Sequence, residues 1–114
     1  MKKVVKFLSV FIAAGVFFCL TGCARQQRAD YSAKSAEFSL NSGKNLKNKT
    51  IRFKIKKLIP NSAFGYNMET GKHLNFVSDE NPNVKKGDTV IVKVDNVKSI
   101  LGSYVIEYSD LKKQ

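Results

Sequence analysis

Cysteine, histidine and tryptophan are almost absent from this chain of 114 residues, which has two cysteines, one histidine and no tryptophan. Both cysteines, Cys19 and Cys23, lie near the N-terminus, so we expect no disulfide to hold a folded domain together. The lone His73 has neither a second histidine nor a cysteine pair to share a zinc ion with. We therefore predict no metal and no cofactor, and a domain that depends on an ordinary hydrophobic core.

Motifs of catalysis are lacking as well. No serine stands in a Gly-x-Ser-x-Gly elbow, and there is no glycine-rich phosphate loop. His73 would need a positioned partner such as Glu69, Asp79 or Asp88 to act as a general base. Asp79, Glu80 and Asp88 do not have the spacing of a calcium loop. An exposed histidine at a strand end and a solvated acidic loop are the simpler interpretations, and we predict that the protein is not an enzyme.

The first 23 residues have the three parts of a secretory signal. Residues 1–6 contain three lysines, residues 7–20 contain no charge, and Leu20-Thr21-Gly22 brings small residues up to Cys23. The uncharged run would make about 21 Å of helix, which is too short for a hydrocarbon core of about 30 Å. A transmembrane helix is therefore the weaker alternative.

The four residues Leu20-Thr21-Gly22-Cys23 resemble the lipobox of bacterial prolipoproteins. The resemblance implies that a signal peptidase recognises Leu20, Thr21 and Gly22 and cleaves before Cys23, which carries a diacylglycerol thioether. It predicts a signal peptide over residues 1–22 and a protein anchored by its lipid to the extracytoplasmic face of the cell membrane. An ordinary secretory signal, in which Cys23 has no role, is the alternative.

Cleavage at this point would leave residues 23–114. Three of the 20 lysines and arginines go with the signal, so 17 remain against nine acids, and the net charge is +8. Residues 23–49 are polar and rich in lysine and asparagine, which predicts a flexible tether of about 25–30 Å. Residues 33–40 have the composition of a short helix, and packing of the segment on the domain is the alternative.

Alternation of apolar and charged residues begins at Ile51, where the period of two predicts a strand. A slip of one residue near Lys56-Lys57 predicts a bulge that bends this strand. Residues 63–77 form a hairpin around Gly71, and Pro82 lies in a polar loop. The predicted strands cover residues 51–59, 63–68, 73–77, 89–97 and 104–108.

Five short strands within residues 50–114, the first of them bent, predict a small all-β barrel. The layout resembles the oligonucleotide/oligosaccharide-binding (OB) fold in its bent first strand, its hairpin from Ala63 to Val77 and the entry of residues 84–92 into the fourth strand. That fold usually has a helix before the fourth strand, whereas residues 78–86 allow only a loop here. The resemblance implies a five-stranded OB-like barrel, and we expect it to be monomeric.

A basic segment without any acid runs from Lys44 to Lys57. It supplies the candidate residues for binding an anionic partner: Lys49, Arg52, Lys54, Lys56 and Lys57. The charge could hold the domain near an anionic membrane or envelope polymer, or meet an acidic protein partner. Single-stranded nucleic acid would need two or more aromatic rings exposed on the same side, but the period places most rings inside. We therefore favour a binding or accessory module over a nucleic-acid-binding protein.

Overall fold

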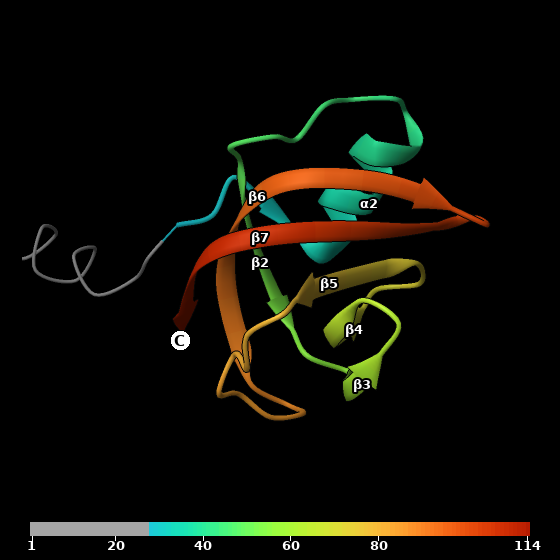
Figure 1. Ribbon diagram of the computed structural model, residues 1–114. Helices are drawn as coiled ribbons and strands as arrows, with labels where there is room; N and C mark the ends of the chain where they lie inside the picture. Colours follow the sequence, from blue (N-terminus) through green and yellow to red (C-terminus); the bar gives the residue numbers. More distant parts are fainter. Residues whose placement is uncertain (1–27) are drawn as a thin grey trace, which may run out of the picture.

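The computed structural model describes residues 28–114, which form one mixed β-sheet of seven strands and one short helix (Figure 1). The predictions for residues 1–22 and for Cys23 lie outside this part of the chain. The helix is α2 (Ala33–Asn41). The strands are β1 (Tyr31–Ser32), β2 (Thr50–Lys54), β3 (Lys57–Ser62), β4 (Gly65–Thr70), β5 (Leu74–Ser78), β6 (Thr89–Ile100) and β7 (Ser103–Lys113). No helix in the described part has the length and apolar character needed to cross a membrane.

The expected closed barrel of five strands is wrong, because the sheet is open and its order is β1-β2-β6-β7-β5-β4-β3. The predicted first strand is divided into β2, which pairs with β6, and β3, which pairs with β4. Its break lies at Ile55 and Lys56, whose amides donate to the carbonyls of Asp88 and Glu69 respectively. Because these two neighbouring amides bond to different partners, the chain leaves its pairing with β6 at this point and begins to pair with β4.

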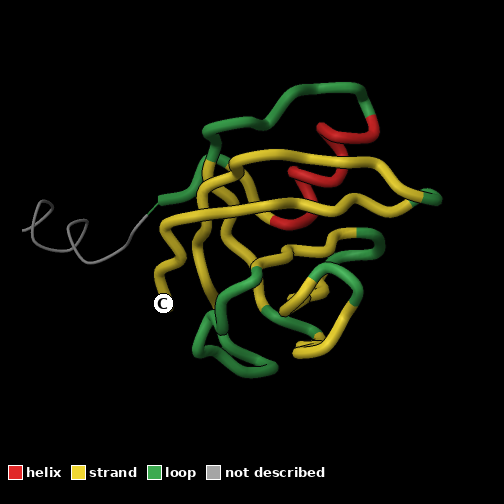
Figure 2. Tube along the Cα trace, in the orientation of Figure 1, coloured by secondary structure: helices red, strands yellow, loops and turns green. Residues whose placement is uncertain are grey.

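The predicted hairpin around Gly71 is confirmed, and a second hairpin joins the last two strands, which are longer than predicted (Figure 2). The strands β4 and β5 pair antiparallel around Gly71, whose positive φ of 59° suits a residue without a Cβ. The strands β6 and β7 form the longest antiparallel pair, and their turn has positive φ at Leu101 and Gly102. Between the hairpins, β5 and β7 pair in parallel, and residues 79–88 form the expected loop.

The expected tether is corrected from Asp30 onward, because this segment packs on the sheet. The strand β1 pairs in parallel with β2. A capping box joins Ser32 and Ser35 at the start of α2. Ala36 and Leu46 are both fully buried in the core. The alternative of a short helix packed on the domain is therefore confirmed for the described residues, and the domain begins near residue 30.

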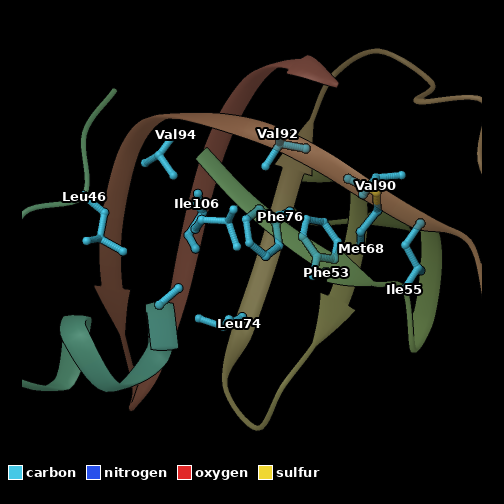
Figure 3. Packing of buried hydrophobic residues seen from close by; sticks show 12 residues of the cluster. Leu46, Phe53, Ile55, Met68, Leu74, Phe76, Val90, Val92, Val94 and Ile106 are labelled. Atoms are coloured by element: carbon cyan, nitrogen blue, oxygen red, sulfur yellow. The ribbon is translucent and has the colours of Figure 1, made fainter. Parts of the chain in front are cut away.

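Aromatic stacking occupies the centre of the core (Figure 3). The rings of Phe53 and Phe76 stack with their centroids 4.1 Å apart, and Tyr108 meets Phe76 edge-on at 6.5 Å. Aliphatic side chains from five strands and from the segments on either side of β2 surround these rings: Leu46, Ile51, Ile55, Met68, Leu74, Val90, Val92, Val94 and Ile106. Burial of these residues draws β2, β4, β5, β6 and β7 around one core, and α2 contributes Ala36 to it.

Candidate anion-binding groove

A groove of about 600 Å³ lies between α2 and the turn that joins β4 to β5. Four cationic side chains line it: Lys34, Lys54, Lys56 and Lys72. Its surface is nevertheless mostly apolar, with Ala33, Phe38 and the aliphatic stems of the lysines as contributors. We call this feature the lysine groove. It combines an apolar wall with positive charge, a pairing that suits a ligand with both apolar and anionic groups.

The groove depends on three separate elements. Lys34 and Phe38 stand four residues apart on α2, so they share one face of the helix. Lys54 ends β2 and Lys56 lies just beyond it. Lys56 Nζ lies 3.4 Å from the carbonyl oxygen of Gly71 in the β4–β5 turn. Phe38 is 72% exposed, which makes it one of the few large apolar side chains on the described surface.

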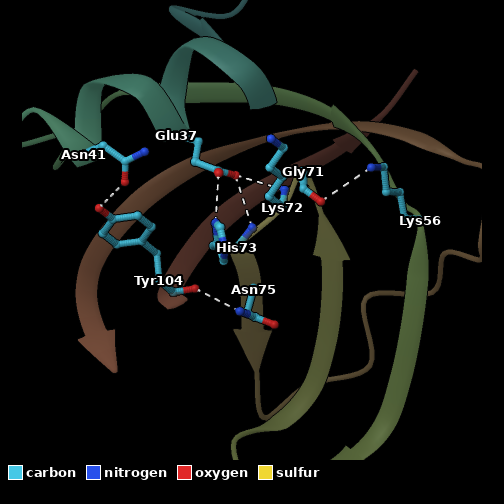
Figure 4. Close-up of polar contacts among 8 residues, drawn as sticks. All are labelled: Glu37, Asn41, Lys56, Gly71, Lys72, His73, Asn75 and Tyr104. Atoms are coloured by element: carbon cyan, nitrogen blue, oxygen red, sulfur yellow. Dashed lines mark hydrogen bonds and ion pairs between the residues drawn. The ribbon is translucent and has the colours of Figure 1, made fainter. Parts of the chain in front are cut away.

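Glu37 fixes α2 against the β4–β5 turn (Figure 4). Its Oε1 accepts hydrogen bonds from the backbone amides of Lys72, at 3.0 Å, and His73, at 3.2 Å. Its Oε2 lies 3.1 Å from His73 Nδ1. A second contact joins the far end of α2 to β7, where the Tyr104 hydroxyl donates to Asn41 Oδ1 at 2.7 Å. These contacts hold one wall of the lysine groove in place.

The turn leaves no space for a side chain where it meets Glu37. A Cβ added at Gly71 would lie 2.8 Å from Glu37 Oε1, which is too close for two non-bonded atoms. Glycine suits this position because its φ is positive, and a larger residue would also push the Glu37 carboxylate aside.

The charge of Glu37 is stabilised in the folded protein. Burial acts to raise the pKa of this carboxyl, but the hydrogen bonds from the His73 amide, the His73 ring and the Lys72 amide outweigh it and lower the pKa below the ordinary value of 4.5. Because the pKa falls on folding, the contribution of Glu37 to stability is complete above pH 4.5 and is lost as the pH falls through the lowered pKa.

Glu37→Gln should therefore destabilise the domain by about 1–2 kcal/mol at neutral pH, because it weakens charge-assisted hydrogen bonds to two amides. The difference in free energy of unfolding between wild type and variant should shrink as the pH falls below 4.5. Urea unfolding at a series of pH values measures it. Glu80→Gln, in the exposed loop before β6, is the matched control and should leave the stability unchanged. A difference for Glu37→Gln that stays constant down to about pH 3 would contradict this account.

The five predicted basic residues do not form one site. Lys54 and Lys56 line the lysine groove, but Arg52 lies opposite Ile91 of β6 on the outer face of the sheet. Lys57 lies on β3 opposite Glu69, and Lys49 precedes β2. The division of the first strand separates Lys57, which lies on β3, whereas Arg52 and Lys54 both belong to β2 and only Lys54, at its end, reaches the groove.

The other two groove lysines and Phe38 were not predicted. Lys34 and Phe38 belong to the segment expected to be a tether, and Lys72 lies in the hairpin turn. The spacing of Lys34, Glu37 and Phe38 on a short helix was the only signal in the sequence that these side chains share one face. Only the docking of α2 on the sheet brings that face to Lys54. Among the predicted rings, Phe53 and Phe76 are buried, so they cannot stack on a nucleic-acid base.

The carboxylate partner of His73 is none of the three acids that the sequence suggested for it. Its ring contacts Glu37, which is 36 residues away, and no hydrogen bond or ion pair joins this ring to Glu69, Asp79 or Asp88. Within residues 28–114, no three His, Cys, Asp or Glu side chains gather in a way that could hold a metal ion. The two Oε atoms of Glu37 are already used by the turn, so the pair has the role of a structural contact.

Comparison of the chain with protein-family models, with curated proteins and with solved structures finds no match.

Proposed function

We propose that this protein is a membrane-anchored, extracytoplasmic lipoprotein whose domain acts as a binding or accessory module, not as an enzyme. Its ligand is an acidic segment of a protein partner that also carries apolar side chains. The observation that carries the proposal is the lysine groove, where four lysines surround a mostly apolar surface beside Phe38. A purely anionic polymer would have no use for this surface, whereas a peptide with carboxylates and an apolar anchor would use both parts.

The anchoring half of the proposal rests on Leu20-Thr21-Gly22-Cys23 and its resemblance to the lipobox. Lipidation at Cys23 would place the domain on the outer side of the cell membrane, where its partner would be another envelope protein. The excess of lysine over acid in the chain suits such a surface, since it favours attraction of anionic groups.

We also propose that the sheet is an open variant of the OB layout. Two observations support it: the bent first strand supplies both β2 and β3, which pair with β6 and β4, and β5 pairs in parallel with β7. Along the chain, one bent strand is then followed by the β4–β5 hairpin and by the β6–β7 hairpin. The proposal concerns architecture and assigns no ligand.

The experiment that tests the groove is a titration of residues 24–114, which include the whole described domain, with a labelled peptide of alternating glutamate and leucine. We expect binding that weakens with salt. The triple variant Lys34→Gln/Lys54→Gln/Lys72→Gln removes three positive charges from the groove. It should weaken peptide binding about ten-fold, since exposed ion pairs contribute roughly 0.2–1 kcal/mol each. Phe38→Ala should cause a loss that salt does not change, because it removes apolar contact.

The matched control is Lys57→Gln/Lys86→Gln/Lys98→Gln, which has the same net charge but leaves the groove intact. Equal loss of binding in the two triple variants, or no effect of Phe38→Ala, would overturn the groove as the site. Labelled single-stranded DNA in parallel tests the alternative of nucleic-acid binding. Binding of DNA that is stronger than that of the peptide and falls steeply with salt would favour phosphate recognition.

A further inference from the structure

A second cluster of cations lies on the outer face of the sheet, outside the lysine groove. Cross-strand register places Arg52 of β2 opposite Ile91 of β6, and Ile91 opposite Lys112 of β7. The next row places Thr50 opposite Lys93. Residues directly opposite each other share one face of a sheet, so these cations project together. With Arg28 they form what we call the basic sheet face: Arg28, Arg52, Lys93 and Lys112.

Three of the four cations of the basic sheet face line a hollow. Its volume is about 290 Å³, and Arg28, Lys93, Lys112 and Ile91 are among the residues that line it. Ile91 is only 5% exposed although it points away from the core, which fits cover by the long aliphatic stems of its cationic neighbours. The charged ends of these side chains are then left toward the solvent.

Two acids offset part of this charge. Asp110 lines the same hollow, and Asp30 lies beside Thr50, whose hydrogen bonds favour the negatively charged form of its carboxylate. Asp30 Oδ2 accepts from the Thr50 amide at 3.0 Å and from the Thr50 hydroxyl at 3.2 Å. The hydrogen bond from the Thr50 backbone amide is the main reason that the pKa of Asp30 is lowered. Four cations thus face two carboxylates, and the net charge of the face is positive.

The position of this face in the chain points to a membrane. Five peptide units join Cys23 to Arg28, and even when fully extended they span no more than about 18 Å. A lipid on Cys23, as proposed above, would therefore keep Arg28 close to the headgroups. The spacer of 25–30 Å expected from the sequence does not exist, because the chain enters the domain at Asp30.

We propose that the basic sheet face docks on anionic phospholipid headgroups and acts as a second membrane contact beside the lipid anchor. The two acyl chains of the proposed diacylglycerol anchor would already make attachment durable, so the contribution of the face is to hold the domain itself against the bilayer. Each cation held near an anionic bilayer strengthens binding about five-fold. The face then orients the domain, so that β2, β6 and β7 lie toward the lipid.

The test uses residues 24–114, which lack the lipid. The vesicles consist of phosphatidylcholine with or without about 30 mol% phosphatidylglycerol, an anionic lipid. Co-sedimentation at low salt should detect binding to the anionic vesicles only. Arg52→Gln/Lys93→Gln/Lys112→Gln should weaken that binding about a hundred-fold, whereas Lys57→Gln/Lys86→Gln/Lys98→Gln should weaken it far less. Arg52→Lys/Lys93→Arg/Lys112→Arg keeps the charge and should bind like wild type, which separates charge from any change in folding.

Three outcomes would overturn the proposal: no binding to anionic vesicles at low salt, equal binding to neutral vesicles, or equal losses in the two glutamine triple variants. The groove variant Lys34→Gln/Lys54→Gln/Lys72→Gln should keep at least the binding of the Lys57, Lys86 and Lys98 control. Failure of vesicle binding and failure of peptide binding in the groove are therefore separate results.

Discussion

Leu46→Ala should lower the free energy of unfolding by about 2–5 kcal/mol, the usual cost of truncating a fully buried leucine. Leu46 has no exposed surface and belongs to the core cluster with Ile51 and Val94. A domain of this size has only about 5–15 kcal/mol of stability, so the variant should unfold at a much lower urea concentration. Chemical unfolding followed by circular dichroism measures the change.

Leu101→Ala is the control for the same substitution at a surface position. Leu101 is fully exposed at the turn between β6 and β7, and we expect a change within about 0.5 kcal/mol. If the two leucine variants were equally stable, residues 42–49 would not be part of the folded domain, and the flexible tether expected from the sequence would be right after all.

Cys23→Ser should release the protein from the membrane almost completely, because a serine hydroxyl cannot carry the thioether-linked lipid that the lipobox implies. Fractionation of cells, with a high-salt wash to remove charge-mediated attachment, and mass spectrometry of the product measure the effect. The wild-type membrane form should have a lipid-sized mass on Cys23.

Cys19→Ser is the matched control, since it changes the other cysteine in the same segment. It should leave both the lipid and the membrane attachment intact. An unmodified Cys23 in the wild-type membrane fraction, or normal attachment of Cys23→Ser, would contradict the lipoprotein assignment and favour an ordinary secretory signal.

The β4–β5 hairpin was predictable because it is local. Alternation of apolar residues and the glycine in the turn are enough to specify the β4–β5 pair around Gly71. The bend in the first strand was also expected, and the break lies at Ile55 and Lys56, one residue before the predicted bulge.

Contacts between distant segments were not predictable in this way. The helix α2 has only one fully buried residue, Ala36, so its sequence has no apolar stripe that would indicate docking. Its attachment depends on Glu37, which meets amides 35 and 36 residues away. The lysine groove shares this origin, because Lys34 and Phe38 reach Lys54 only once the helix is in place. A basic segment in the sequence therefore identified two of the four groove lysines and missed the wall that gives the groove its shape.

The join between Asp30 and Thr50 has a mechanical consequence. Any pull on the N-terminal side of the chain meets the domain at this point, where three hydrogen bonds link the two residues and β1 runs parallel to β2. Tension along parallel strands loads their hydrogen bonds together in shear, so that they resist as a group instead of opening one after another. A protein held by that end to a moving surface would thus transmit the pulling force into the sheet through these hydrogen bonds. The force would have to break them together before it reached the core.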